Sequence, residues 1–166
     1  MGRKIKYMKL KQLLFFLKER VAYAHCDIPC GIYDPHASQV AAHTILRMTQ
    51  LISEIKRENE TKAEHDIART TFVKEEHSDL LEEELDTLAH DYFKQEQYEQ
   101  FPNLKELFEK TLKAGAKARQ NIDIEAAKET LENTMQIAEI FFKSKGVESI
   151  RVPSLFPTGG EIVVQK

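Results

Sequence analysis

Apolar residues recur at three- and four-residue intervals over four long stretches of the chain, which is the period of an amphipathic helix. The most regular of them is Leu81, Leu85, Leu88 and Tyr92. The four helices are predicted over residues 35–57, over 62–93, from Pro102 onward, and after a cap at Asn121 or Asp123. Because polar or Pro-containing segments separate them, the pattern predicts an all-α, antiparallel up-down four-helix bundle.

The first of these helices has a clear start signal. Asp34 can act as the N-cap, and Pro35 suits the first helical position because its missing N–H has no partner to lose there. The bundle is therefore expected to span residues 35–145, with a Gly- and Pro-containing N-terminal hook at residues 25–34 in front of it.

Residues 1–24 differ from the rest in charge. They hold seven Lys or Arg residues and one acid, which leaves 17 of the 24 basic and 26 of the 27 acidic residues in the rest of the chain. Leu10, Leu13, Leu14, Leu17 and Val21 fall on one side of a helical projection. The continuous apolar run at residues 13–17 is shorter than the roughly seven to fifteen residues of a secretory signal core. We therefore predict a removable basic leader and a cytoplasmic protein, with export left open.

Charge and hydropathy exclude two classes of partner. An acidic body lacks the basic face that nucleic-acid binding requires. No apolar run approaches the ~20 residues of a membrane-spanning helix, so no stable membrane insertion is expected. At the other end, residues 146–166 carry three Gly and two Pro before a short β-like segment at 162–164. They predict an irregular tail outside the bundle.

The candidate chemistry lies in the hook. Cys26 and Cys30 are the two cysteines of the chain and are too close in sequence for a disulfide to stabilise much. Together with His25 they offer thiolate and imidazole ligands within six residues. Pro29 and Gly31 supply the curvature that would wrap this segment around one ion. A structural zinc site would want four tetrahedral ligands, whereas a compact site that recruits backbone nitrogen suits Ni(II) or Cu(II). Taken alone, the two thiols are equally compatible with ordinary residues in a turn.

The complete string HCDIPCGIYDP at residues 25–35 narrows the choice. From His25 to about Lys145 the chain resembles nickel superoxide dismutase, on this string and on the segments HDYFK at 90–94 and FPNL at 101–104. The resemblance implies a four-helix domain over residues 25–145. It also implies that residues 1–24 are a propeptide that a maturation protease removes by cutting before His25.

The resemblance also implies a ligand set for a nickel ion. His25 would bind with its new free amine and its imidazole, Cys26 with its thiolate and backbone nitrogen, and Cys30 with a second thiolate. The ion would alternate between Ni(II) and Ni(III) while converting superoxide to oxygen and hydrogen peroxide. The family forms a homohexamer, so an oligomer is expected.

Four further residues receive expected roles around the ion. Asp27 and Tyr33 would order the hook and act at the cavity that superoxide enters. Tyr92 would complete that cavity, and Lys94 would supply local positive charge for an anionic substrate.

One departure from the family pattern concerns support of the axial imidazole. Where the family has a Glu and an Arg, this chain has Ala41 and His77. Losing both together leaves no unpaired charge, and His43 or His77 is a candidate to take over the contact. Two alternatives to the enzyme are compatible with the sequence: a non-catalytic nickel or copper carrier that uses the same hook, and an interaction protein in which bundle and leader dock on a partner.

Overall fold

The computed structural model describes residues 30–166. The leader, His25, Cys26 and Asp27 lie outside the described residues. The elements are α2 (His36–Glu54), α3 (Glu60–Asp86), the π-helix η1 (Thr87–Tyr92), α4 (Gln95–Gln100), α5 (Leu104–Gln120), α6 (Ile124–Ser144), β1 (Ser149–Pro153) and β2 (Glu161–Gln165).

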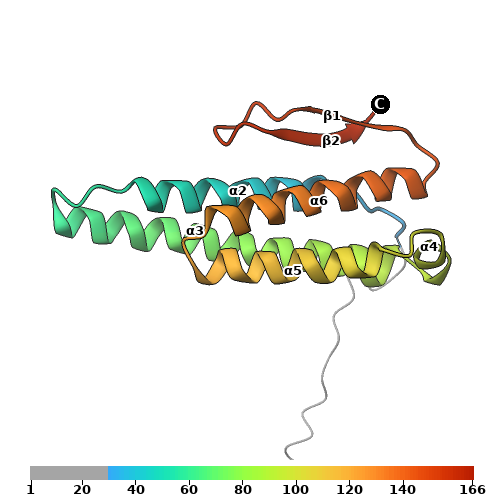
Figure 1. Cartoon of the computed structure of the whole chain (residues 1–166), viewed down its shortest axis with the longest axis horizontal. Coiled ribbons are helices and arrows are strands. Elements are labelled where there is room, and N and C mark those ends of the chain that lie inside the picture. The colour runs from blue at the N-terminus through green and yellow to red at the C-terminus, as the bar shows by residue number, and fades with distance from the viewer. Residues whose placement is uncertain (1–29) are drawn as a thin grey trace, which may run out of the picture.

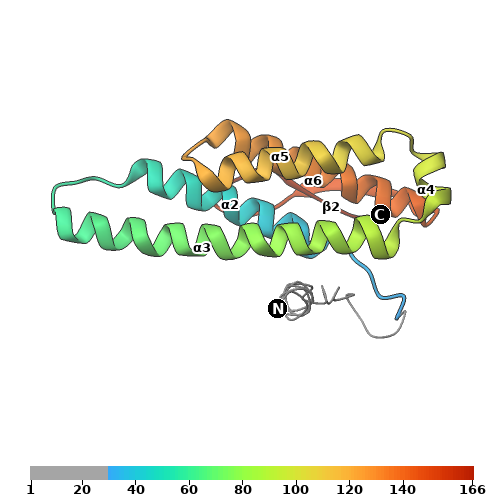
Figure 2. The same ribbon diagram turned by 90° about the horizontal axis from the view of Figure 1, so that it is seen from below.

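The four long helices pack side by side as an antiparallel bundle, which confirms the predicted helical-bundle fold (Figures 1 and 2). Each of three pairs, α2 with α3, α5 with α6 and α2 with α6, forms an extensive contact. The connection between α2 and α3 lies at one end of the bundle, whereas α4 and the hook lie at the other. Among the described helices, none is both long and apolar enough to cross a lipid bilayer.

The apolar stripes read from the sequence form the core. Leu81, Leu85 and Leu88 are each at most 2% exposed, and Phe93 and Phe141 are equally buried near the α4 end. The remaining core residues include Ile45, Leu104, Phe108, Ala127, Leu131, Ile137 and Ala138. At ~1.5–3 kcal/mol for each large side chain, this burial is what holds the helices together.

Side chains complete the helix ends. The Asn59 and Asp123 side chains accept the amide N–H of Lys62 and Ala126, as N-caps do. Asp34, two residues before the helix begins at His36, accepts the N–H of His36 at 2.7 Å, and Pro35 rather than Asp34 is the N-cap. At the C-terminal end of α5, the buried Lys74 Nζ donates to the carbonyls of Ala118 (3.0 Å) and Asn121 (2.9 Å). Burial lowers the pKa of Lys74.

The second predicted helix is divided in the structure. It runs as α3 to Asp86 and then continues as η1, whose wider turn changes the direction of the side chains that follow. The next stretch, expected to be a loop, contains the one-and-a-half-turn helix α4. The N–H of Lys94 bonds to the Gln97 side chain and starts this helix, so the Gln-rich composition stabilises a helix that its weak apolar pattern does not reveal.

The expectation of an irregular C-terminal tail outside the bundle is wrong. Strands β1 and β2 form an antiparallel hairpin in which Arg151 pairs with Val163, and the hairpin lies over α2 and α6 (Figure 1). The Val163 side chain is 2% exposed and belongs to the core. Arg151 bonds to Glu132 and Glu139 of α6. The hairpin forms because α2 and α6 supply the apolar surface and the charges that the tail alone lacks.

A buried side chain also joins the hairpin to α2. Gln39 donates from Nε2 to the carbonyl of Val163 at 3.1 Å and accepts the N–H of Val163 at 2.7 Å. A helix side chain thereby satisfies both backbone groups of a buried strand residue, as a neighbouring strand would.

Candidate metal centre

The described part of the hook is a short extended segment with one sharp turn. Gly31 has a φ of +71°, and a Cβ added there would meet nothing within 4 Å. The glycine is therefore required by its backbone conformation and not by crowding. The turn brings the Ile32 N–H to 3.4 Å from Cys30 Sγ. An amide donor aimed at the sulfur favours its thiolate form, which is the form that binds metals.

The hook meets the bundle at a cluster of aromatic side chains. The Tyr33 ring lies 5.5 Å from that of Tyr92, which in turn lies 4.6 Å from Phe141 and 4.8 Å from Phe93. Tyr33 and Tyr92, predicted from different parts of the sequence to share one cavity, are thus in contact within one chain.

The Tyr92 hydroxyl is held in a defined direction. It lies 2.7 Å from Ser144 Oγ, and Ser144 donates its single hydroxyl proton to the carbonyl of Phe141 at 2.7 Å. Since a serine hydroxyl has one proton to give, Tyr92 must be the donor to Ser144. The Tyr92 hydroxyl proton is therefore used in the bond to Ser144, and the Tyr92 hydroxyl oxygen can still accept a hydrogen bond.

A lysine that the sequence did not single out completes the cluster. Lys145 Nζ lies 4.4 Å from the Phe141 ring centroid and 5.4 Å from that of Tyr92. It also lies 3.4 Å from the carbonyl oxygen of Tyr33. A cation over two ring faces is attracted by their electron density. Lys145 thereby fixes the hook backbone to the end of α6 and places positive charge beside it.

The described residues fit one edge of a thiolate-bound metal site. Cys30 is half-buried, three residues before Tyr33 in the chain, with an amide donor on its sulfur. Within residues 30–166 no three His, Cys, Asp or Glu side chains come together as a metal site. His25 and Cys26, the other ligands expected from the sequence, lie before residue 30 and outside the described residues.

The comparison with known families decides the assignment. The family model described as nickel-containing superoxide dismutase matches residues 20–145, which include the hook and all of the bundle. The chain belongs to this family.

Curated relatives and solved structures agree. The chain is 34% identical over 132 residues to a nickel superoxide dismutase of Streptomyces seoulensis, which covers 80% of this chain and 95% of the relative. It is 33% identical over 122 residues to the Streptomyces coelicolor enzyme. The 1.30 Å structure of native nickel superoxide dismutase superposes with a TM-score of 0.65 at 30% identity, over 73% of this chain and 99% of that one. The match to the family ends at residue 145, so the hairpin lies beyond the nickel superoxide dismutase part of the chain.

Two of the residues predicted around the ion bond to backbone carbonyls four residues before them in the chain. Lys94 is exposed, and its Nζ donates to the carbonyl of His90 at 3.2 Å. His77 bonds through Nδ1 to the carbonyl of Val73 at 2.8 Å. It precedes Tyr92 by fifteen residues, or about 20 Å along the helix at about 1.5 Å per residue. The roles of Lys94 and His77 at the ion stay predictions.

In the structure His43 binds the hairpin, whereas the sequence made it a candidate to support the axial imidazole of the metal site. Its Nε2 donates to the carbonyl of Glu161 at 3.0 Å, so its Nδ1 accepts the hydroxyl proton of Thr158 at 2.8 Å. Burial lowers the pKa of His43, and the bond to Glu161 offsets part of that effect. Both ring nitrogens are engaged by the hairpin, while Ala41 is fully buried in the core. The two α2 positions thus contribute to packing and to hairpin attachment.

Proposed function

We propose that the chain is a nickel-dependent superoxide dismutase, which converts two superoxide ions and two protons to oxygen and hydrogen peroxide. The observation that carries the proposal is the contact of the hook with the Tyr33–Tyr92–Phe141 cluster and Lys145, in a chain that matches the family from residue 20 to residue 145. A carrier needs ligands alone, whereas this arrangement adds groups suited to an anionic substrate.

His25, Cys26 and Cys30 would hold the nickel ion. Bound there, nickel supplies one-electron redox chemistry, and thiolate donors make its oxidation accessible. Cys30 is prepared for this role by the Ile32 amide, which stabilises negative charge on the sulfur. Lys145, whose Nζ lies 3.4 Å from the Tyr33 carbonyl oxygen, also places a cation beside the hook, and positive charge favours the thiolate as well.

The remaining residues would attract the anionic substrate and orient hydroxyl groups beside the hook. Lys145 offers positive charge beside the hook, which favours approach of a small anion to an otherwise acidic protein. Tyr33 and Tyr92 bring two hydroxyl-bearing rings to the same place, and Ser144 fixes the direction of the second. Since the product takes up two protons, hydroxyl groups beside the hook can hold the water or peroxide that exchanges them. Asp27 would help to order the hook.

The proposed mature protein begins at His25. A free α-amine has a pKa near ~8 and binds metal once deprotonated, whereas an amide nitrogen within the chain is a weak ligand. Removal of residues 1–24 by a protease would therefore create the site. The short apolar run of the leader supports a cytoplasmic protein.

A homohexamer, or another homo-oligomer, is proposed for the mature form. Three apolar side chains support it by their exposure: Leu155 at 93%, Ile32 at 77% and Phe72 at 61%. Ile32 lies in the hook itself, so burying it in an assembly would also shield the site.

Metal analysis tests the proposal together with an activity assay. Protein beginning at His25 should retain one nickel per chain through dialysis against a chelator and should dismute superoxide. Cys30→Ser and Cys26→Ser should each abolish activity while the helical circular-dichroism spectrum stays intact, because both thiols lie outside the helices. Nickel that a chelator strips readily, with no dismutation, would establish the carrier instead. Absence of bound nickel would favour the interaction protein.

A further inference from the structure

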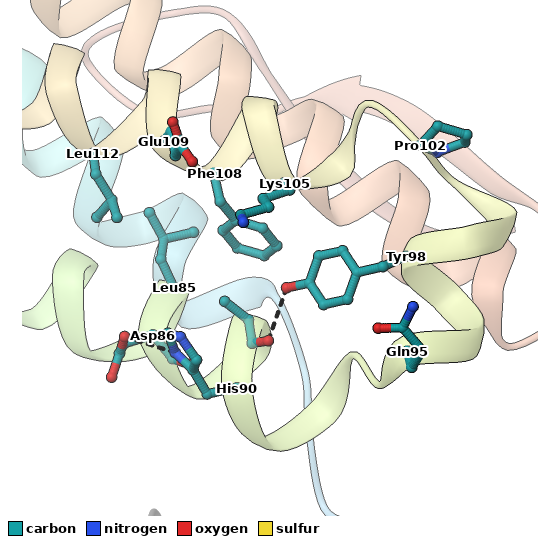
Figure 3. A pocket seen from close by; sticks show the side chains of 11 residues that line it. Leu85, Asp86, His90, Gln95, Tyr98, Pro102, Lys105, Phe108, Glu109 and Leu112 are labelled. Atoms are coloured by element: carbon teal, nitrogen blue, oxygen red, sulfur yellow. Dashed lines mark hydrogen bonds and ion pairs between the residues drawn. The ribbon is translucent and has the colours of Figure 1, made fainter.

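A second feature lies on the other side of the aromatic cluster from the hook. It is a groove of about 630 Å³ between α3 with η1 on one wall and α4 with α5 on the other. Figure 3 shows Leu85, Phe108 and Leu112 in its interior, with Tyr98 at one end. The Tyr98 hydroxyl donates to the carbonyl of Ala89 at 2.8 Å, which holds the wall in shape. Leu112 is 39% exposed, so the groove presents apolar surface to solvent.

The rim of the groove is acidic. Asp86 and Glu109 stand on opposite walls, and Figure 3 shows both carboxylates beside the apolar interior. A second hollow of about 670 Å³ shares Asp86 and Leu112 with the first and continues along the same helices. The acids that line the two are Asp79, Glu82, Glu83, Asp86 and Glu109, against Lys105, Lys113 and His90. Ion pairs engage four of these acids: Arg119 with Asp79 and Glu82, His90 with Asp86, and Lys113 with Glu109. This combined surface, the acidic groove, is an apolar trough with a negative border.

We propose that the leader, residues 1–24, docks in the acidic groove of its own chain. The leader has the complementary composition, with seven basic residues and one acid around the apolar series Leu10, Leu13, Leu14 and Leu17. Apolar side chains spaced by three and four residues suit a trough with Leu85, Phe108 and Leu112 in it, and lysines on both sides meet carboxylates on both walls. Glu83 is the clearest acceptor, since it is exposed and no charged partner faces it among residues 30–166.

The connection to the hook is long enough. Three ring-to-ring steps lead from Tyr33 to the groove: 5.5 Å to Tyr92, 4.8 Å to Phe93 and 5.9 Å to Phe108, which lines it. Residues 22–29 would span roughly 14–17 Å as a flexible linker and about 28 Å fully extended. Because Phe93 and Phe108 are buried, the linker must pass over the surface around them, and a linker able to make that span holds the leader at an effective concentration near the millimolar range. A groove with only modest affinity for the free peptide would then be filled in the uncut chain.

Docking of this kind also explains how the leader would leave. A cut before His25 removes the tether, so the leader falls from a millimolar effective concentration to its free concentration and dissociates. The inference depends neither on nickel nor on activity, because it concerns the uncut chain alone. A negative result for leader docking would therefore leave the proposed function unchanged, and a negative result for the proposed function would leave leader docking unchanged.

Zero-length carbodiimide coupling of the full 166-residue chain tests the proposal. The reagent joins a lysine amine to a carboxylate only where the two touch. Mass spectrometry should find leader lysines joined to Asp86. A mixture of chains with light and heavy nitrogen should give such links within one isotope only, which identifies docking in cis.

Two variants and a control sharpen the test. Leu13→Ser with Leu17→Ser keeps every reactive group and leaves the bundle untouched, and should lower the Asp86 link at least about tenfold, because two apolar contacts are lost. Glu83→Lys with Glu109→Lys should lower it at least about fivefold, through repulsion at both walls. The control, Glu54→Lys with Glu58→Lys, makes the same charge change among exposed residues at the opposite end of the bundle and should change it less than twofold.

Three results would overturn the proposal. Links of mixed isotope would show that the leader of a second copy fills the groove. Links from lysines of the bundle of another chain would show that the groove is an interface between copies. Equal Asp86 links in the leader variant and in the unaltered chain would show only charge attraction without docking.

Discussion

Replacing Gln39 with Ala should release the hairpin from the bundle. Gln39 is fully buried and satisfies both the N–H and the carbonyl of Val163, at 2.7 and 3.1 Å. Alanine leaves both groups in a buried place without a partner, at about 1–3 kcal/mol for each. The total cannot exceed the free energy of lifting the hairpin into water, where the groups find new partners. We therefore expect a loss of about 3 kcal/mol, or a fall in Tm of about 6–12 °C for a chain of this size.

Amide hydrogen exchange and thermal melts together measure the effect. The Val163 amide should exchange much faster in Gln39→Ala, while amides in the middle of α3 stay protected. Gln95→Ala is the matched control, because Gln95 bonds to the exposed Glu99 side chain within α4; its Tm should change by less than about 2 °C. A Gln39→Ala protein with unchanged Val163 exchange and a Tm within 1 °C of wild type would refute the reasoning.

Three further substitutions address the site and its surroundings. Tyr33→Phe should keep nickel but change the rate or the product inhibition, and loss of nickel would show that its hydroxyl holds the metal or the hook directly. Lys145→Gln should lower kcat/KM and flatten its dependence on ionic strength, since it removes a cation beside the hook. Lys143→Gln, the control, removes a cation over Phe101 instead, and equal effects of the two would contradict a specific role. For His43, whose pKa is lowered in the fold, the unfolded chain takes up the proton first, so wild type should lose stability as the pH falls below about 6.5. His43→Gln should lose less between pH 7.5 and 5.5 in urea unfolding, and parallel losses would refute the assignment.

The sequence predicts the parts of the fold that depend on local periodicity. Leu81, Leu85 and Leu88 lie on one face at any plausible helix boundary, so the bundle followed from their spacing. Helix α4 and the hairpin were missed for different reasons. The first has no buried residue in its length. The second depends on pairing with α2 through Gln39, which no local pattern in the tail reveals.

The residues of the site also fall into two groups, those predicted from the sequence and those that only the structure shows. Cys30 and Tyr33 are predicted as site residues from the hook string, and Tyr92 from the family pattern. Lys145 and Ser144 join them only because the end of α6 packs against the hook, more than a hundred residues away in the chain. Conversely, His43 is a candidate to support the axial imidazole on residue type alone, and only the structure shows its nitrogens bound to Thr158 and Glu161.

One comparison tests the central claim most directly. The full 166-residue chain and protein beginning at His25 are each loaded with nickel, freed of excess metal and assayed for dismutation of superoxide. The account predicts one retained nickel per chain and full activity for the trimmed protein, with little activity for the uncut chain, because His25 has no free amine there. Equal dismutation by both forms would show that the amine is not a ligand, and a trimmed protein that binds nickel but leaves superoxide untouched would contradict the assignment as an enzyme.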